Sequence, residues 1–153
     1  MAKVIRIPDI KNYTQKIVNS ELILTPIYKS KSKNYITENE LNLTQFTHST
    51  IESCVVKKKD RIISVSTSYR SIVIDIWKTL PTQKILQNTK FNFKLTNEYG
   101  KKGYTWCSDI HMSFQGKNSR DTIREIINMI KINKYTIKIA IKLKTGKIIY
   151  FKL

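Results

Sequence analysis

The strictest pattern in the chain is an alternation of apolar and polar residues that runs from residue 136 to residue 144. Isoleucine or leucine occupies positions 137, 139, 141 and 143, and lysine occupies positions 138, 142 and 144. A period of two is typical of a β-strand with one face in the core and the other in water. The apolar segment 147–153 follows a Thr-Gly pair. These residues therefore predict an antiparallel hairpin that turns at Thr145–Gly146.

The segment before this hairpin predicts two further strands and a helix. Apolar residues alternate with polar ones over 89–97 and again over 104–114, so we expect a long hairpin closed by the loop between them. Four isoleucines within residues 119–132 follow the i, i+3, i+4, i+7 spacing of an amphipathic helix. Asn118 or Ser119 can cap this helix by accepting a hydrogen bond from a free N–H group of its first turn.

A similar order of elements is predicted upstream. Residues 50–56 and 61–68 flank the sequence "KKKD" and favour a hairpin. The apolar residues between Tyr69 and Leu80 fit one stripe of a helix that Ser68 can cap, and Pro81 interrupts it before a further turn or two. The β-branched residues in this stripe leave a strand as the alternative.

Together these elements predict an α+β fold in a single domain. Antiparallel hairpins alternate with amphipathic helices in the order ββα-ββα-ββ over residues 50–153, a basic core that is consistent with a duplicated ββα unit. Residues 1–49 are expected to form an N-terminal extension. It would contain one strand at 21–28, followed by a polar, flexible stretch at 29–39.

The charge of the chain favours a polyanionic partner. The net charge is +17, from 28 basic and 11 acidic residues, and 18 of the basic but only five of the acidic residues lie in 61–153. Such an excess repels itself in a compact state unless a polyanion neutralises it. The chain has no signal-like apolar segment at its start and no apolar run that could span a bilayer, so we expect an intracellular protein without membrane contact. Its two cysteines predict free thiols.

Basic residues recur at the tip of each predicted hairpin and on the polar strand faces. Tyrosines beside the second tip could stack on bases, and a phosphate could dock at the predicted N-terminus of helix 119–132. The expected nucleic-acid-binding residues are Lys57, Lys58, Lys59 and Arg61 at the first tip, Tyr99, Lys101, Lys102 and Tyr104 at the second, Lys144 and Lys147 at the third, Lys94, Lys138 and Lys142 on strand faces, and Lys117 and Arg120 near the helix.

One cluster resembles a catalytic or metal site but has unsuitable spacing. Cys107, Asp109 and His111 would share a strand face, yet Cys107 and His111 would lie about 13 Å apart at ~3.3 Å per residue, beyond the reach of one zinc ion. The sequence "QGKNS" lacks the first glycine of a phosphate loop, because His111 stands in that position. We therefore expect no catalytic residue, metal or cofactor.

The function favoured by these patterns is non-catalytic binding of DNA or RNA with little sequence specificity. Lysines outnumber arginines 23 to five, and lysine is poorly suited to bidentate base readout. The alternative is a structural or assembly subunit whose charge meets an acidic protein. A nuclease-type enzyme is a third possibility, which the scarcity of paired acidic residues disfavours. The sequence leaves the oligomeric state and the choice between DNA and RNA open.

Overall fold

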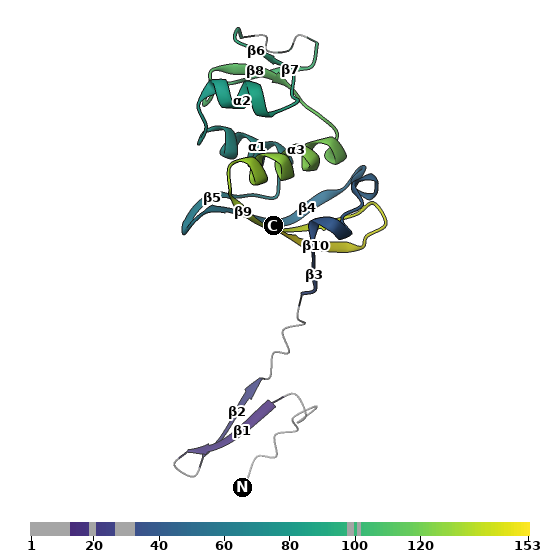
Figure 1. Cartoon of the computed structure of the whole chain (residues 1–153). Coiled ribbons are helices and arrows are strands. Elements are labelled where there is room, and N and C mark those ends of the chain that lie inside the picture. Colours follow the sequence, from purple (N-terminus) through teal and green to yellow (C-terminus); the bar gives the residue numbers. More distant parts are fainter. Residues whose placement is uncertain (1–12, 19–20, 27–32, 98–99, 101) are drawn as a thin grey trace. The chain divides into compact units, whose positions relative to one another are not determined.

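The computed structural model describes residues 13–18, 21–26, 33–97, 100 and 102–153 (Figure 1). By its internal contacts the chain forms two compact units, residues 1–33 and residues 34–153. In the first unit, β1 (Tyr13–Val18) and β2 (Glu21–Pro26) form an antiparallel pair. The sequence predicted β2 but not its partner β1.

A mixed five-stranded sheet is the centre of the second unit. Its strands lie in the order β3-β10-β9-β4-β5, with β3 parallel to β10 and all other neighbours antiparallel. The strands are β3 (Tyr35–Ile36), β4 (Thr50–Lys58), β5 (Arg61–Val65), β9 (Thr136–Lys142) and β10 (Ile148–Lys152).

The predicted C-terminal hairpin is confirmed, and its turn explains the glycine. The Leu143 amide donates a hydrogen bond to the Lys147 carbonyl, and the Gly146 amide donates one to the Leu143 carbonyl. Gly146 has a φ of +86°, a conformation that side chains with a Cβ rarely adopt. The hairpin register that follows places Ile141 opposite Ile149.

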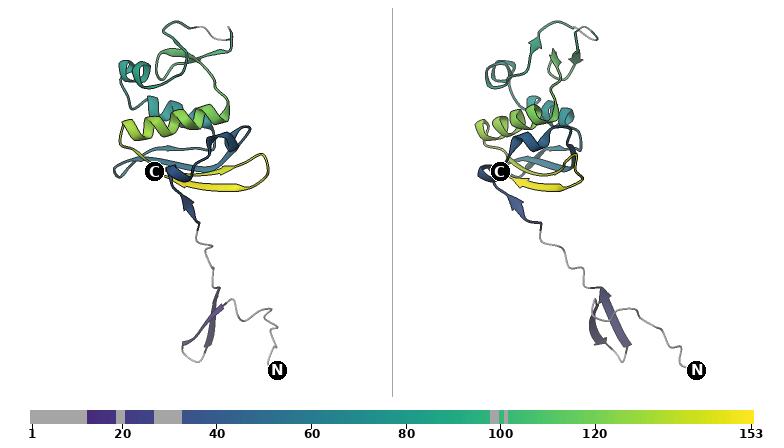
Figure 2. Two further views of the ribbon diagram at one scale, coloured as in Figure 1. Left: turned by 45° about the vertical axis from the view of Figure 1, so that its right-hand side comes forward. Right: turned by 90° about the vertical axis from the view of Figure 1, so that its right-hand side faces the viewer.

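Three α-helices are present in the described part of the chain, and α1 and α3 lie on one side of the five-stranded sheet (Figure 2). Helix α1 (Tyr69–Trp77) is capped by Ser68, whose side chain accepts a hydrogen bond from the Ser71 amide. The helical prediction for this segment is therefore confirmed over the strand alternative. Pro81 ends the connection and precedes α2 (Thr82–Asn88). Helix α3 (Ser119–Ile132) is capped by Asn118.

The core fills the space between this sheet and the helices. On β9 the residues Ile137, Ile139 and Ile141 are buried, as their alternation predicted. They belong to one apolar cluster with the isoleucines of α3, including Ile126 and Ile130, that formed the predicted stripe. The predicted α+β class is thus confirmed, because helices segregate to one face of a largely antiparallel sheet.

A second, three-stranded sheet departs from the predicted hairpin. Its strands are β6 (Phe93–Lys94), β7 (Tyr104–Cys107) and β8 (Met112–Gln115), in the order β6-β8-β7. The sequence predicted that residues 89–97 pair with a single strand over 104–114, but β6 pairs with β8, and β7 turns back on β8 at residues 108–111. The turn reverses the chain within the segment that the alternation marked as continuous.

This turn also changes which residues face the interior. The prediction placed Trp106 on the same face as Met112 and Phe114, with Cys107 on the opposite face. A four-residue turn pairs Cys107 with Met112 and Trp106 with Ser113, and directly opposite residues share a face. Cys107 is accordingly buried while Trp106 is only half-buried.

An aromatic cluster joins the small sheet to α1. Trp77 is fully buried, and its ring lies 5.0 Å from each of the rings of Phe91, Phe93 and Phe114 in edge-on contacts. Such edge-to-face pairs stabilise aromatic clusters beyond their burial of apolar area. Trp77 is therefore a core residue, as its helical position predicted.

Residues 34–49, which the sequence analysis placed with the N-terminal extension, lie within the second compact unit. Two short 3-10 helices, η2 (Glu38–Glu40) and η3 (Leu43–Phe46), follow β3. Phe46 is fully buried, and its carbonyl accepts a hydrogen bond from the Ser119 hydroxyl at the start of α3. Among the described residues, no helix is long and apolar enough to cross a membrane.

Candidate nucleic-acid interface

The face of the five-stranded sheet that α1 and α3 do not cover carries most of the exposed side chains of β9 and β10. Because neighbouring residues of a strand point to opposite faces, burial of Ile137, Ile139 and Ile141 leaves Lys138 and Lys142 exposed. We call this surface the open face. Its residues used below are Tyr35, Val55, Lys57, Lys138, Lys142, Tyr150 and Lys152.

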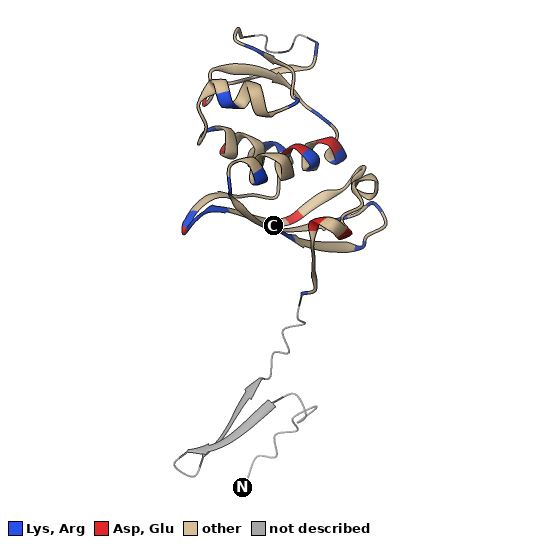
Figure 3. Cartoon of the chain, viewed as in Figure 1, with Lys and Arg blue, Asp and Glu red and all other residues tan. Residues whose placement is uncertain are grey.

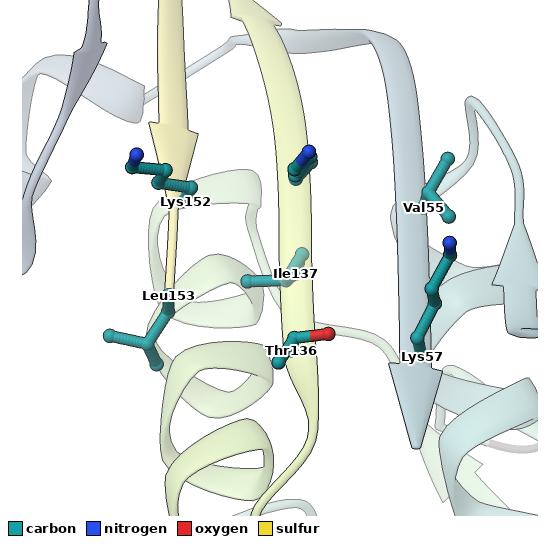
Figure 4. Close-up of a pocket in the computed structure, with 7 residues that line it drawn as sticks. Val55, Lys57, Thr136, Ile137, Lys152 and Leu153 are labelled. Carbon is teal, nitrogen blue, oxygen red and sulfur yellow. The ribbon is translucent and has the colours of Figure 1, made fainter. Parts of the chain in front are cut away.

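A depression with a volume of about 630 Å³ lies across three adjacent strands of the open face (Figure 4). Lys57 of β4, Lys138 of β9 and Lys152 of β10 line it. In the strand register Lys138 stands opposite both Lys152 and Val55. We call this hollow the basic depression. Its other lining residues are Val55, Thr136, Ile137 and Leu153.

The three lysines of the basic depression lack internal compensation. No carboxylate of the described residues forms an ion pair with Lys57, Lys138 or Lys152. Lys142, farther along β9, differs because its ammonium nitrogen lies 3.9 Å from a carboxylate oxygen of Glu52. Like charges on adjacent strands repel one another, so an anion bound among them would relieve that repulsion.

Two tyrosine rings extend this surface to the edge of the sheet. Tyr35 of β3 stands opposite Tyr150 of β10, and their ring centroids lie 5.9 Å apart in an edge-on arrangement. Both side chains are half-buried. The Lys152 ammonium lies 5.9 Å from the centroid of the Tyr35 ring, so one lysine borders both the tyrosine pair and the basic depression.

The basic hairpin tips lie at opposite ends of the five-stranded sheet (Figure 3). The register pairs Lys57 with Thr136 at one end and Thr50 with Lys142 at the other. The first tip, with Lys58, Lys59 and Arg61, is thus at the same end as the basic depression. Lys144 and Lys147 are exposed at the far end, in the turn between β9 and β10.

The residues predicted around the second tip belong to the small sheet. Lys94 was expected on a strand adjacent to the lysines of 138–144, but it lies in β6, where its ammonium is 5.1 Å from the centroid of the Tyr104 ring. Lys102 is exposed at the entry to β7. Tyr99 and Lys101 lie outside the described residues. Since β6 and β7 do not pair with each other, this loop is not the tip of a hairpin.

Lys117 and Arg120, predicted beside the N-terminus of α3, have acidic partners within the fold. The Lys117 ammonium lies 3.8 Å from a carboxylate oxygen of Glu125, which is only 4% exposed. The Arg120 Nε lies 3.3 Å from a carboxylate oxygen of Asp121. The hydrogen bond from the Asn118 side chain lowers the pKa of Asp121, which keeps its negative charge in place. Unlike the lysines of the basic depression, these two cations therefore have acidic partners within the fold.

Lys152, Tyr35 and Tyr150 are not among the residues predicted from the sequence. A signal existed for two of them, because Tyr150 and Lys152 alternate with the buried residues Ile149 and Phe151 in the last strand. Tyr35 had no such signal. It lies in a strand of two residues, too short for a period to be recognised.

The spacing argument for Cys107, Asp109 and His111 was wrong because these residues do not share a strand. Cys107 ends β7 and is buried, whereas Asp109 lies in the turn with a carboxylate oxygen 3.8 Å from the Lys78 ammonium. His111 occupies the left-handed region, with a φ of 51°. In the described part of the chain, no group of three or more His, Cys, Asp or Glu side chains is placed to hold a metal ion.

No protein-family model, curated protein or solved structure matches this chain. The function of the chain must therefore be inferred from its residues and geometry.

Proposed function

We propose that the protein is a non-catalytic nucleic-acid-binding protein and that its binding surface is the open face. The observation that carries the proposal is the basic depression, where Lys57, Lys138 and Lys152 line one hollow without an acidic partner among the described residues. The phosphate groups of a nucleic acid are ligands suited to several unpaired ammonium groups on one surface. The first hairpin tip adds positive charge at the same end of the sheet.

One feature of the same face favours a second candidate, a structural or assembly subunit that binds a protein. Val65 and Ile62 of β5 are 66% and 57% exposed, and Val65 stands opposite Val55 in the sheet. Exposed aliphatic side chains at a sheet edge are suited to a protein interface. A partner for this surface would need acidic groups placed against the three lysines.

The salt dependence of binding tests the proposed role of the lysines. Each lysine that neutralises a phosphate releases a counterion, so log affinity for a single strand falls against log salt with a slope of about −0.7 per contact. Changing Lys57, Lys138 and Lys152 together to glutamine should flatten the slope by about two units. The readout is fluorescence anisotropy of a labelled oligonucleotide across a salt series.

A matched variant with the same loss of charge separates local contacts from the general field. Lys84, Lys90 and Lys134 are exposed on α2 and in the connections after α2 and α3. Their combined change to glutamine should leave most of the slope intact. Equal effects of the two triple variants would show that the depression is not the binding surface. Absence of binding to any DNA or RNA at low salt would favour the assembly subunit.

A further inference from the structure

We infer that the open face is selective for single-stranded nucleic acid because it stacks bases on Tyr35 and Tyr150 while the basic depression holds the phosphates beside them. This inference rests on the proposed function and adds a ligand class to it. The observations that carry it are the position of the tyrosine pair, its continuity with the depression and the aliphatic lining of the hollow.

The tyrosine pair and the depression form one continuous path across four strands. Tyr35 and Tyr150 are opposite each other on β3 and β10, and Lys152 follows Tyr150 by two residues, on the same face. Lys138 stands opposite Lys152, and Val55 stands opposite Lys138. Adjacent strands are ~4.8 Å apart, so three steps from β3 to β4 span about 14 Å. With roughly 3.4 Å per stacked nucleotide, this path accommodates a few nucleotides.

The chemistry along this path alternates between groups suited to bases and groups suited to phosphates. Tyr35 and Tyr150 are half-buried at the sheet surface, and tyrosine is suited to bases because every base has a π-face that can stack on an aromatic ring. The Lys152 ammonium lies over the Tyr35 ring, 5.9 Å from its centroid, so a base at this ring would have a cation close to its phosphate. Val55 and Leu153 give the depression aliphatic lining that a base can contact and a phosphate cannot use.

A double helix cannot make these contacts. Its bases are stacked inside the duplex, and its outer surface offers phosphates and groove edges. A duplex would therefore contact the lysines of the open face but would not stack bases on the tyrosine rings or contact the aliphatic lining. The predicted preference is for DNA or RNA strands whose bases are unpaired.

The test compares ligands that share a phosphate chain but differ in their bases. Fluorescence anisotropy with the full chain would use oligomers of about 12 nucleotides, within the usual site size of single-strand binders. The probes are oligo-dT, oligo-rU, an abasic deoxyribose-phosphate strand and a DNA duplex. We expect oligo-dT to bind at least tenfold more tightly than the abasic strand at the same salt, and more tightly than the duplex. The ratio of oligo-dT to oligo-rU affinity distinguishes DNA from RNA.

Tyrosine variants connect this difference to the proposed residues. Changing Tyr35 and Tyr150 together to alanine should lower the affinity for oligo-dT about tenfold or more, leave the salt slope unchanged and remove the advantage over the abasic strand. Changing both to phenylalanine should retain the advantage, because the ring remains. Circular dichroism melts of both variants confirm that they are folded.

Three outcomes would overturn the inference, and one of them also rejects the proposed function. If the abasic strand or the duplex binds as tightly as oligo-dT, the open face contacts only phosphates. The proposed nucleic-acid function then stands without base stacking. If the phenylalanine pair loses as much affinity as the alanine pair, ring stacking is not the cause. If no strand binds at low salt while an acidic polypeptide does, both the function and the inference fail.

Discussion

At the scale of single residues, position relative to the sheet separates side chains that can meet a ligand from those that cannot. Lys138 and Ile139 are neighbours in the chain, yet one is exposed beside the depression and the other is buried under α1 and α3. Burial also determines which thiols can react with a reagent in solution. Both cysteines, Cys54 and Cys107, are free and buried, which places them out of reach of such reagents.

Cys54 gives a prediction about thiol chemistry and pH. Burial raises the pKa of its thiol from 9.0 to about 12, so the reactive thiolate is scarce in the folded chain at pH 8. We expect an aromatic disulfide reagent to titrate neither cysteine in the native protein and both in denaturant.

The same shift has a defined sign for stability. Because the unfolded thiol ionises near pH 9 and the folded one only near pH 12, this group favours the folded state fully below pH 9 and loses that contribution as the pH rises toward 12. A Cys54→Ala variant should show a smaller decline in unfolding free energy over that pH range. Rapid labelling of Cys54 at pH 8 in the native protein would contradict its buried position.

At the scale of elements, helix α3 depends on the cap that its sequence supplies. The Asn118 side-chain oxygen accepts a hydrogen bond from the Asp121 amide, 2.8 Å away, at the positive end of the helix. Asn118→Ala should lower the free energy of unfolding by about 1 kcal/mol in urea titrations. Asn118→Ser keeps an acceptor at this position and should lose much less. Equal losses in the two variants would show that the cap does not contribute.

How far the sequence predicts an element depends on whether one face of that element is continuously buried. The β9–β10 hairpin and α3 pack along their whole length on one core, so the periods of Ile137–Ile141 and Ile123–Ile130 predict both elements correctly. The same alternation misleads over 104–114, because one apolar residue, Ile110, continues it through the turn at 108–111. Ile110 in that turn is itself buried. The apolar pattern therefore gives no sign that the chain reverses there.

Only part of the candidate site was predictable, because local alternation shows which face of a strand a residue occupies but not which strands are its neighbours. A lysine row on β9 follows from local alternation, and the structure confirms that Lys138 and Lys142 are exposed on one face. Which strands lie beside β9 is a property of the whole sheet. Lys57 and Lys152 come next to Lys138 through pairings of β9 with β4 and β10, and the local sequence around Lys94 could not show that it belongs to another sheet.

At the scale of the whole molecule, some basic side chains have a carboxylate partner and others do not. Lys117, Arg120, Arg124 and Lys131 on or beside α3 have carboxylate partners within the fold. The lysines of the basic depression have no such partners among the described residues. Exposed lysines without a carboxylate partner in the described part of the chain also occur elsewhere, such as Lys84, Lys90 and Lys134. The depression is where three of them line one hollow, and this grouping supports the proposed function.

Lysine footprinting identifies which lysines a bound nucleic acid covers. The full chain would be acetylated briefly with and without a saturating single-stranded oligonucleotide, and the modification of each lysine measured by mass spectrometry. The proposal predicts that Lys57, Lys138 and Lys152 become several-fold less reactive in the complex, while the exposed lysines Lys84, Lys90 and Lys134 keep their reactivity. Protection of the latter three, with the depression lysines unchanged, would contradict the assignment of the open face as the binding surface.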